Sequence, residues 1–215
     1  MKGEVYCELK MYGKAIKIFE NLLRKDKSHA VSWTNLGSIY WTLGRLKLAE
    51  AHYRQAIRLN PRRASVLNYL GRLLVERGRI EQACPLLRKA IRLDFSQAVT
   101  TRGKFLSMGS KFSNRNQHTK AFRFYQAACR TIPTDPRLHM ELGRCLIFLK
   151  QYKKGIFHLR RAVQIYPGYQ NGWSMLGRGY YCAGDLKNGF AFSELALKMD
   201  KGDKRALETI SMIGW

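Results

Sequence analysis

The chain of 215 residues has few acidic side chains, few prolines and no long apolar run. Asp and Glu number 15 against 39 for Lys and Arg, so the formal net charge is +24 and polyanionic partners are favoured. No stretch approaches the roughly 18 consecutive apolar residues of a membrane span, and the first residues lack the apolar core of a signal peptide. We therefore expect a soluble, intracellular protein, cytoplasmic and without a transmembrane segment.

Cysteine, histidine and acidic residues often bind metals or act in catalysis, but in this sequence their spacing suits neither role. The five cysteines lie far apart without a Cys-x-x-Cys pair, which favours neither a disulfide framework nor a zinc site. The five histidines lack metal-binding spacing, and we interpret them as lone surface residues. No carboxylate pair suited to acid–base catalysis stands out. We expect no catalytic residue, no metal and no cofactor, and hence no enzymatic activity in this chain.

A Leu-Gly pair recurs through the chain at a nearly constant spacing. It occurs at residues 36–37, 70–71, 142–143 and 176–177, with Met108-Gly109 at the corresponding place between them. The steps are 34 residues long except the one from Leu70 to Met108, which is 38. The sequence therefore predicts a repeated unit, with four extra residues in one connection, near Ala98 to Thr101.

The clearest copy carries bulky and small residues at fixed offsets. They are Trp33, Leu36, Gly37, Tyr40, Ala49, Tyr53, Ala56 and Pro61. Bulky residues at i, i+3 and i+7 form one face of a helix, and small residues allow close helix contact. Gly44, Gly78, Asn116 and Gly184 take matching positions, where a left-handed residue would end the first helix of a pair.

This spacing resembles the tetratricopeptide repeat, and the chain is identified as a member of that family. The resemblance implies an all-α fold, a right-handed α-α superhelix (a tetratricopeptide solenoid) of antiparallel helix pairs. It also implies a non-catalytic scaffold. The predicted organisation is a partial repeat at 1–29, complete repeats at 30–63, 64–97, 102–135, 136–169 and 170–203, and the start of a further helix at 204–215. We see no polar capping helix at either end, so self-association through the ends is a further option.

The first helices of successive repeats are expected to line a concave groove. The ninth repeat position is Arg in three copies, and Arg guanidinium groups suit carboxylates and phosphates. The predicted groove residues are Arg72, Arg144 and Arg178 with Asn35, Trp41, Asn68, Tyr69, Arg137, Asn171 and Tyr181. The alternative is that Arg simply follows Leu-Gly on an exposed helix face.

A second basic surface is predicted on the outer helices. It comprises Arg62, Arg63, Arg88, Lys89, Lys153, Lys154, Arg160 and Arg161. Solvated helix faces usually carry both signs of charge, so the scarcity of acids favours a polyanion here. Residues 104–133 resemble the interferon-induced tetratricopeptide proteins, and this resemblance implies RNA binding in a basic cavity.

Our leading hypothesis is a protein–protein interaction scaffold or adaptor that holds an acidic or extended peptide segment in its groove during complex assembly. Two alternatives stay open. The first is binding of RNA or another polyanion through the basic surface. The second is that the repeats form part of a larger enzyme or assembly factor.

Overall fold

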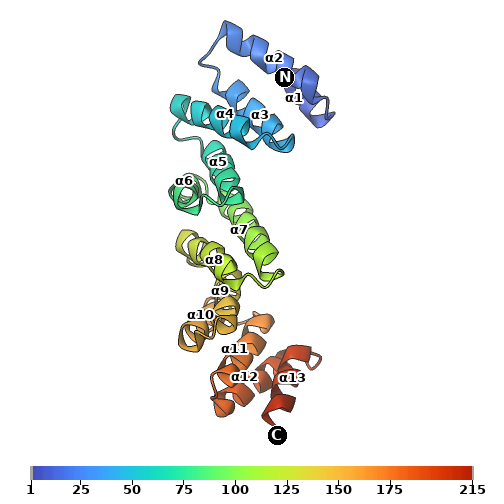
Figure 1. Cartoon of the computed structure of the whole chain (residues 1–215), viewed down its shortest axis with the longest axis vertical. Coiled ribbons are helices and arrows are strands. Elements are labelled where there is room, and N and C mark those ends of the chain that lie inside the picture. Colours follow the sequence, from blue (N-terminus) through green and yellow to red (C-terminus); the bar gives the residue numbers. More distant parts are fainter. Residues whose placement is uncertain (1, 215) are drawn as a thin grey trace. The chain divides into compact units, whose positions relative to one another are not determined.

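The computed structural model describes residues 2–214, and every regular element in this range is an α-helix (Figure 1). The chain divides into two compact units, residues 1–104 and 105–215. The first unit contains α1 (Lys2–Glu8), α2 (Tyr12–Lys25), α3 (Ala30–Thr42), α4 (Leu46–Leu59), α5 (Ala64–Glu76), α6 (Ile80–Leu93) and the beginning of α7 (Gln97–Ser113). The second contains the rest of α7, α8 (His118–Thr131), α9 (Pro136–Phe148), α10 (Tyr152–Ile165), α11 (Gln170–Cys182), α12 (Leu186–Met199) and α13 (Lys204–Ile213).

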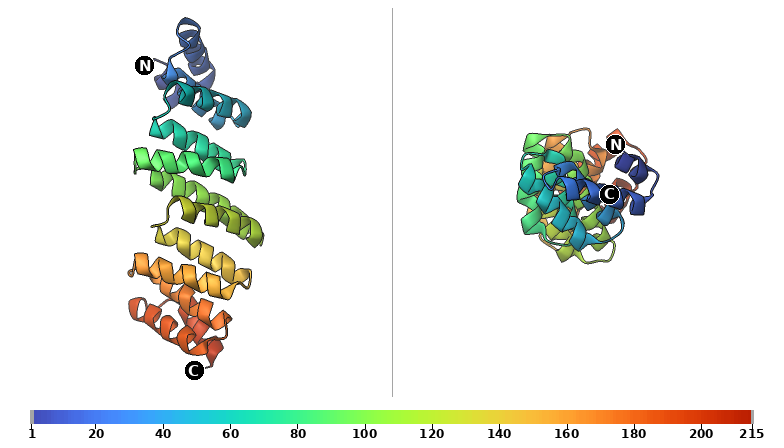
Figure 2. Two further views of the ribbon diagram at one scale, coloured as in Figure 1. Left: turned by 90° about the vertical axis from the view of Figure 1, so that its left-hand side faces the viewer. Right: turned by 90° about the horizontal axis from the view of Figure 1, so that it is seen from above.

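Neighbouring helices pack as pairs within each unit (Figure 2). The most extensive packing joins α3 to α4 and α5 to α6 in the first unit, and α9 to α10 and α11 to α12 in the second. The predicted all-α class of paired helices is therefore confirmed. None of the helices in residues 2–214 combines the length and apolar character needed to cross a bilayer. The repeat boundaries remain a proposal, although α3, α5, α9 and α11 begin at 30, 64, 136 and 170.

The predicted left-handed residues end the first helix of four pairs. Gly44 has φ 72° and Asn116 has φ 56°, and Gly78 and Gly184 are also left-handed. After α3, the amide of Arg45 donates to the carbonyl of Tyr40 and the amide of Gly44 donates to that of Trp41. These bonds satisfy the last carbonyls of the helix and turn the chain toward the second helix.

The fixed glycine of each repeat allows the two helices of a pair to approach closely. A Cβ atom at Gly37 would lie 2.7 Å from the ring of Tyr53, and one at Gly71 would lie 2.5 Å from Leu87. Each bulky partner follows its glycine by 16 residues and is fully buried. Burial raises the pKa of Tyr53 to about 12, and its hydroxyl lies 3.0 Å from that of Ser38.

The four extra residues of the third complete repeat lie in a helix. α7 has 17 residues, whereas α3, α5, α9 and α11 have 13 each. The expectation of a longer connection near Ala98 to Thr101 was therefore wrong, because α7 already begins at Gln97. Buried residues at 98, 101, 105 and 109 keep one continuous face along this longer helix.

A network of charged side chains joins α4 to the turn between α5 and α6. Glu50 of α4 accepts hydrogen bonds from Arg54 at 2.9 Å and from Arg79 at 2.8 Å, and it also pairs with Arg77. Burial alone would raise the pKa of Glu50. The bonds and charges of Arg54 and Arg79 outweigh burial, so the pKa of Glu50 is lowered and the carboxylate stays charged.

Candidate functional site

Two predicted groove residues of the first unit, Trp41 and Arg72, lie in a cluster with Lys104 and Glu76. The guanidinium carbon of Arg72 lies 5.4 Å from the indole centroid, and the ammonium of Lys104 lies 5.5 Å from it. The indole N–H donates to Glu76 at 3.1 Å, and Lys104 pairs with Glu76 at 2.5 Å. Trp41 and Arg72 are thus engaged with neighbouring side chains, which stabilises the packing of α3, α5 and α7.

Asn68 does not line a binding surface, so that prediction was wrong. Its side chain is 0% exposed, and its amide donates to the carbonyl of Gln97 at 3.1 Å and to the hydroxyl of Thr101 at 3.0 Å. These bonds tie α5 to α7. Asn35 and Tyr69 are half-buried, and the ring of Tyr69 lies 5.8 Å from that of Tyr53.

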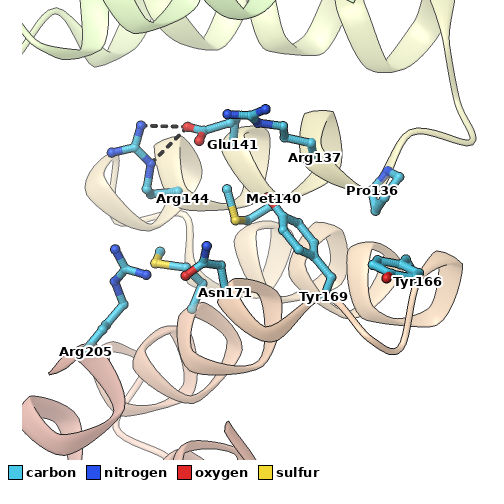
Figure 3. Close-up of a pocket in the computed structure, with 10 residues that line it drawn as sticks. Pro136, Arg137, Met140, Glu141, Arg144, Tyr166, Tyr169, Asn171 and Arg205 are labelled. Carbon is cyan, nitrogen blue, oxygen red and sulfur yellow. Dashed lines mark hydrogen bonds and ion pairs between the residues drawn. The ribbon is translucent and has the colours of Figure 1, made fainter. Parts of the chain in front are cut away.

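The second unit contains a hollow of about 560 Å³ that gathers three arginines, and we call it the arginine hollow (Figure 3). Its lining comprises Pro136, Arg137, Met140, Glu141 and Arg144 of α9, Tyr166 and Tyr169 from the α10–α11 connection, Asn171 and Met175 of α11, and Arg205 of α13. Three predicted groove residues, Arg137, Arg144 and Asn171, therefore come together here.

The repeat explains how three helices present side chains to this hollow. Arg137, Asn171 and Arg205 are spaced by 34 residues, and each is the second residue of its helix. The N-terminal amides of α9 and α13 are already capped, because Asp135 accepts from an α9 amide at 3.1 Å and Asp203 accepts from α13 amides at 3.0 Å. At α9 and α13 a bound anion would therefore meet the arginine side chains, whereas no side chain caps the N-terminus of α11.

The charges in the hollow do not cancel. Arg144 donates from Nε at 3.0 Å and from Nη2 at 2.6 Å to the same oxygen of Glu141. Burial alone would lower the pKa of Arg144, but the Glu141 carboxylate raises it, so this guanidinium is charged. Within residues 2–214, neither Arg137 nor Arg205 has a side-chain ion pair. Three arginines and one glutamate leave a local charge of two positive units.

Two other predicted residues of the second unit do not contribute to this hollow. Arg178 lies 3.3 Å from Glu208 and does not line it, and Tyr181 is half-buried outside it. Sequence reasoning missed Arg205, although its spacing of 34 residues from Asn171 could have indicated it. It also missed Tyr166 and Tyr169, for which the repeat pattern provides no signal.

The predicted outer basic residues are accessible to solvent. Arg62, Arg88, Lys89, Lys153, Lys154, Arg160 and Arg161 are exposed, and Arg63 is half-buried. None of these eight side chains forms an ion pair with another residue of the described chain. The guanidinium of Arg160 also lies 5.5 Å from the ring centroid of Tyr180.

Two histidines are not the lone surface residues that we expected. The Nδ1 atoms of His139 and His158 lie 3.1 Å apart, and Nε2 of His139 lies 3.0 Å from the carbonyl of Pro133. Because that carbonyl can only accept, His139 carries its proton on Nε2, and His158 donates from Nδ1 to Nδ1 of His139. Burial lowers the pKa of His158 to about 4 and also lowers that of His139, so both rings are neutral. No group of three or more potential metal ligands occurs in residues 2–214.

The paired helices and the fixed glycines define a helical-repeat protein. Three family models described as tetratricopeptide repeat match residues 2–62, 35–98 and 136–169, which together are more than half of the chain. The chain belongs to the tetratricopeptide repeat family. This fold is consistent with a protein-interaction scaffold.

Related proteins carry similar repeats within longer chains. Human "Protein O-mannosyl-transferase TMTC1" is 24% identical over 86% of this chain and 25% of its own length. Human "Antiviral innate immune response effector IFIT1" is 26% identical over 83% of this chain and 43% of its own length, which confirms the weak likeness to the interferon-induced tetratricopeptide proteins. This chain thus spans less than half of either relative.

A solved structure shows the same fold. YrrB, described as "a TPR protein with an unusual peptide-binding site", aligns with a TM-score of 0.54 and 18% identity. The alignment covers 90% of this chain and 97% of YrrB. At this identity the likeness concerns the fold alone.

Proposed function

We propose that the chain is a non-catalytic scaffold or adaptor that binds an acidic, extended peptide segment in the arginine hollow and so assists assembly of a larger complex. One observation carries this proposal. The guanidinium groups of Arg137 and Arg205 line one hollow without an ion pair to any side chain in the described part of the molecule. Arginine forks form strong, directional hydrogen bonds with carboxylates.

The walls of the hollow suit a peptide. Tyr166 and Tyr169 lie with ring centroids 6.5 Å apart and provide apolar surface beside the arginines. A charge pair inside a partly enclosed site is screened less than one on an open surface. The peptide-binding site named for YrrB, which shares this fold, is compatible with such a use.

Charge reversal at the two unpaired arginines tests the proposal. The double variant Arg137→Glu/Arg205→Glu should bind a fluorescent acidic peptide about 100-fold more weakly in an anisotropy titration, because each reversal costs about tenfold. The control Lys153→Glu/Arg161→Glu makes the same change in net charge on exposed outer residues. Equal weakening by both variants, or none by the first, would contradict binding in the hollow.

The outer basic residues support a second candidate function, RNA binding. This candidate rests on the observation that these basic side chains are exposed and form no ion pairs, as at Arg88, Lys154 and Arg161. Binding of a single-stranded RNA should weaken steeply with added salt, and the Lys153→Glu/Arg161→Glu variant should bind it less tightly. If no RNA binds at low salt in a filter-binding assay, this candidate is refuted.

A third candidate is that these repeats belong to a larger enzyme or assembly factor. The relative named as an O-mannosyl-transferase supports it, since this chain matches a quarter of that protein. Sequencing the full transcript tests it directly. A cytoplasmic location and self-association through the ends remain predictions, which fluorescence imaging and analytical ultracentrifugation can check.

A further inference from the structure

We infer that the arginine hollow selects an extended peptide in which two acidic side chains flank an apolar one, and that Glu141 sets this selectivity. The inference rests on the proposed peptide-binding function and names the ligand class more closely. It follows from the order of charges on the walls of the hollow.

The α9 wall alternates in charge. Arg137, Glu141 and Arg144 stand at i, i+4 and i+7 and therefore on one side of the helix. Figure 3 shows the Glu141 carboxylate between the two arginines, while Arg205 reaches into the hollow from α13 and Asn171 from α11. A ligand thus meets an unpaired cation at Arg137 and another at Arg205, with a carboxylate on the wall between Arg137 and Arg144.

Glu141 is held firmly in this position. Its side chain is 17% exposed, and one of its oxygens receives both bonds from Arg144, at 3.0 and 2.6 Å. An acidic group placed at the centre of the α9 wall would face this carboxylate in surroundings that screen charge poorly. A continuous run of acids, or a nucleic-acid backbone with a charge at every step, therefore fits this hollow less well than separated acids.

Part of the lining of the hollow is apolar. Met140 and Met175 are 8% and 5% exposed, and Figure 3 shows the half-buried ring of Tyr169 beside Met140. The flexible thioether side chains of methionine adapt to apolar side chains of different shapes. In an extended peptide, side chains i, i+2 and i+4 point to the same side. The pattern Asp-x-Leu-x-Asp therefore presents one acid to Arg137, the leucine to the two methionines and the other acid to Arg205.

Two synthetic peptides test the inference, both acetylated and amidated to remove end charges. They are Ser-Asp-Ser-Leu-Ser-Asp-Ser and Ser-Asp-Ser-Asp-Ser-Asp-Ser, each labelled for anisotropy. Wild-type protein should bind the first more tightly. Glu141→Gln should tighten binding of the second by roughly fivefold and remove the preference, because it deletes the repulsion and keeps the shape. Glu208→Gln, an acid paired with Arg178 outside the hollow, should leave the preference unchanged.

The possible results distinguish a failure of the inferred selectivity from a failure of the proposed peptide binding. If Glu141→Gln weakens both peptides equally, Glu141 only positions Arg144 and the inference is overturned while peptide binding stands. If wild type prefers the triple acid, the inference also fails. If neither peptide binds wild type at low salt, the proposed function itself is refuted. Circular dichroism of each variant establishes that the helices remain folded.

Discussion

Replacing Glu50 with Gln keeps the size of the side chain but removes the charge that Arg54, Arg77 and Arg79 share. The Glu50 side chain is 10% exposed, whereas the three arginines are 26–48% exposed. Each pair is therefore closer to a surface ion pair, worth up to about 1 kcal/mol, than to a buried pair, whose disruption costs about 3–5 kcal/mol. Three such pairs on one nearly buried carboxylate predict a loss of about 2 kcal/mol in the free energy of unfolding.

The effect of this substitution should depend on pH. The folded-state pKa of Glu50 is lowered, so the network contributes stability above the unfolded pKa of about 4.3. That contribution is lost as the pH falls through the lowered folded-state pKa. The stability difference between wild type and Glu50→Gln should therefore be full near neutral pH and shrink in acid.

Urea denaturation followed by circular dichroism measures the stability loss, and hydrogen exchange with mass spectrometry localises it. Repeat proteins can open locally, so exchange should increase first in α4, α5 and α6. Glu194→Gln is the matched control, because its pair with Lys198 is exposed and 3.8 Å long. A Glu50→Gln variant as stable as this control at pH 7 would refute the argument.

Four further predictions concern packing and thiol chemistry. Asn68→Ala should cost about 2 kcal/mol in urea denaturation, because it leaves buried groups of α7 without their amide donor. Gly103→Ala should stabilise by about 0.5–1 kcal/mol, since it lies inside α7 with nothing within 4 Å of a Cβ atom. Gly143→Ala should instead destabilise by about 1–3 kcal/mol, since its Cβ would lie 2.9 Å from a backbone oxygen of α10. Burial raises the pKa of Cys129 to about 12, so iodoacetamide should label half-buried Cys182 before Cys129, as peptide mass spectrometry would show.

Much of the fold could be predicted because the repeat couples local and tertiary structure. The glycine at 37 and the tyrosine at 53 specify both a helix face and the partner that fills the space above it. The left-handed residue at 44 then determines where the first helix ends. The extra turn of α7 was misplaced because a change in spacing shows that residues were added without showing whether they are helical.

The candidate site could be predicted only in part, because a helical position does not specify a side chain's neighbours. Asn68 and Arg144 both lie on first helices, yet Asn68 is enclosed by α7 while Arg144 borders a hollow. Arg178 has the same repeat position as Arg144, but Glu208 of a later helix pairs with it. These differences in surroundings arise from contacts with residues about 30 positions away in the sequence. Such contacts form only in the folded chain, so the repeat pattern does not reveal them.

The longer α7 shows which changes in length this repeat accommodates. Four residues advance an α-helix by roughly 400°, about one turn plus 40°, so the buried stripe at 98, 101, 105 and 109 stays nearly in phase. Two added residues would rotate the following half of the helix by roughly 200° and direct Phe105 to solvent. Changes in the length of a helix in this chain are therefore tolerated in whole turns. Insertion of a single residue would move the apolar side chains away from the buried face more than a complete extra turn does.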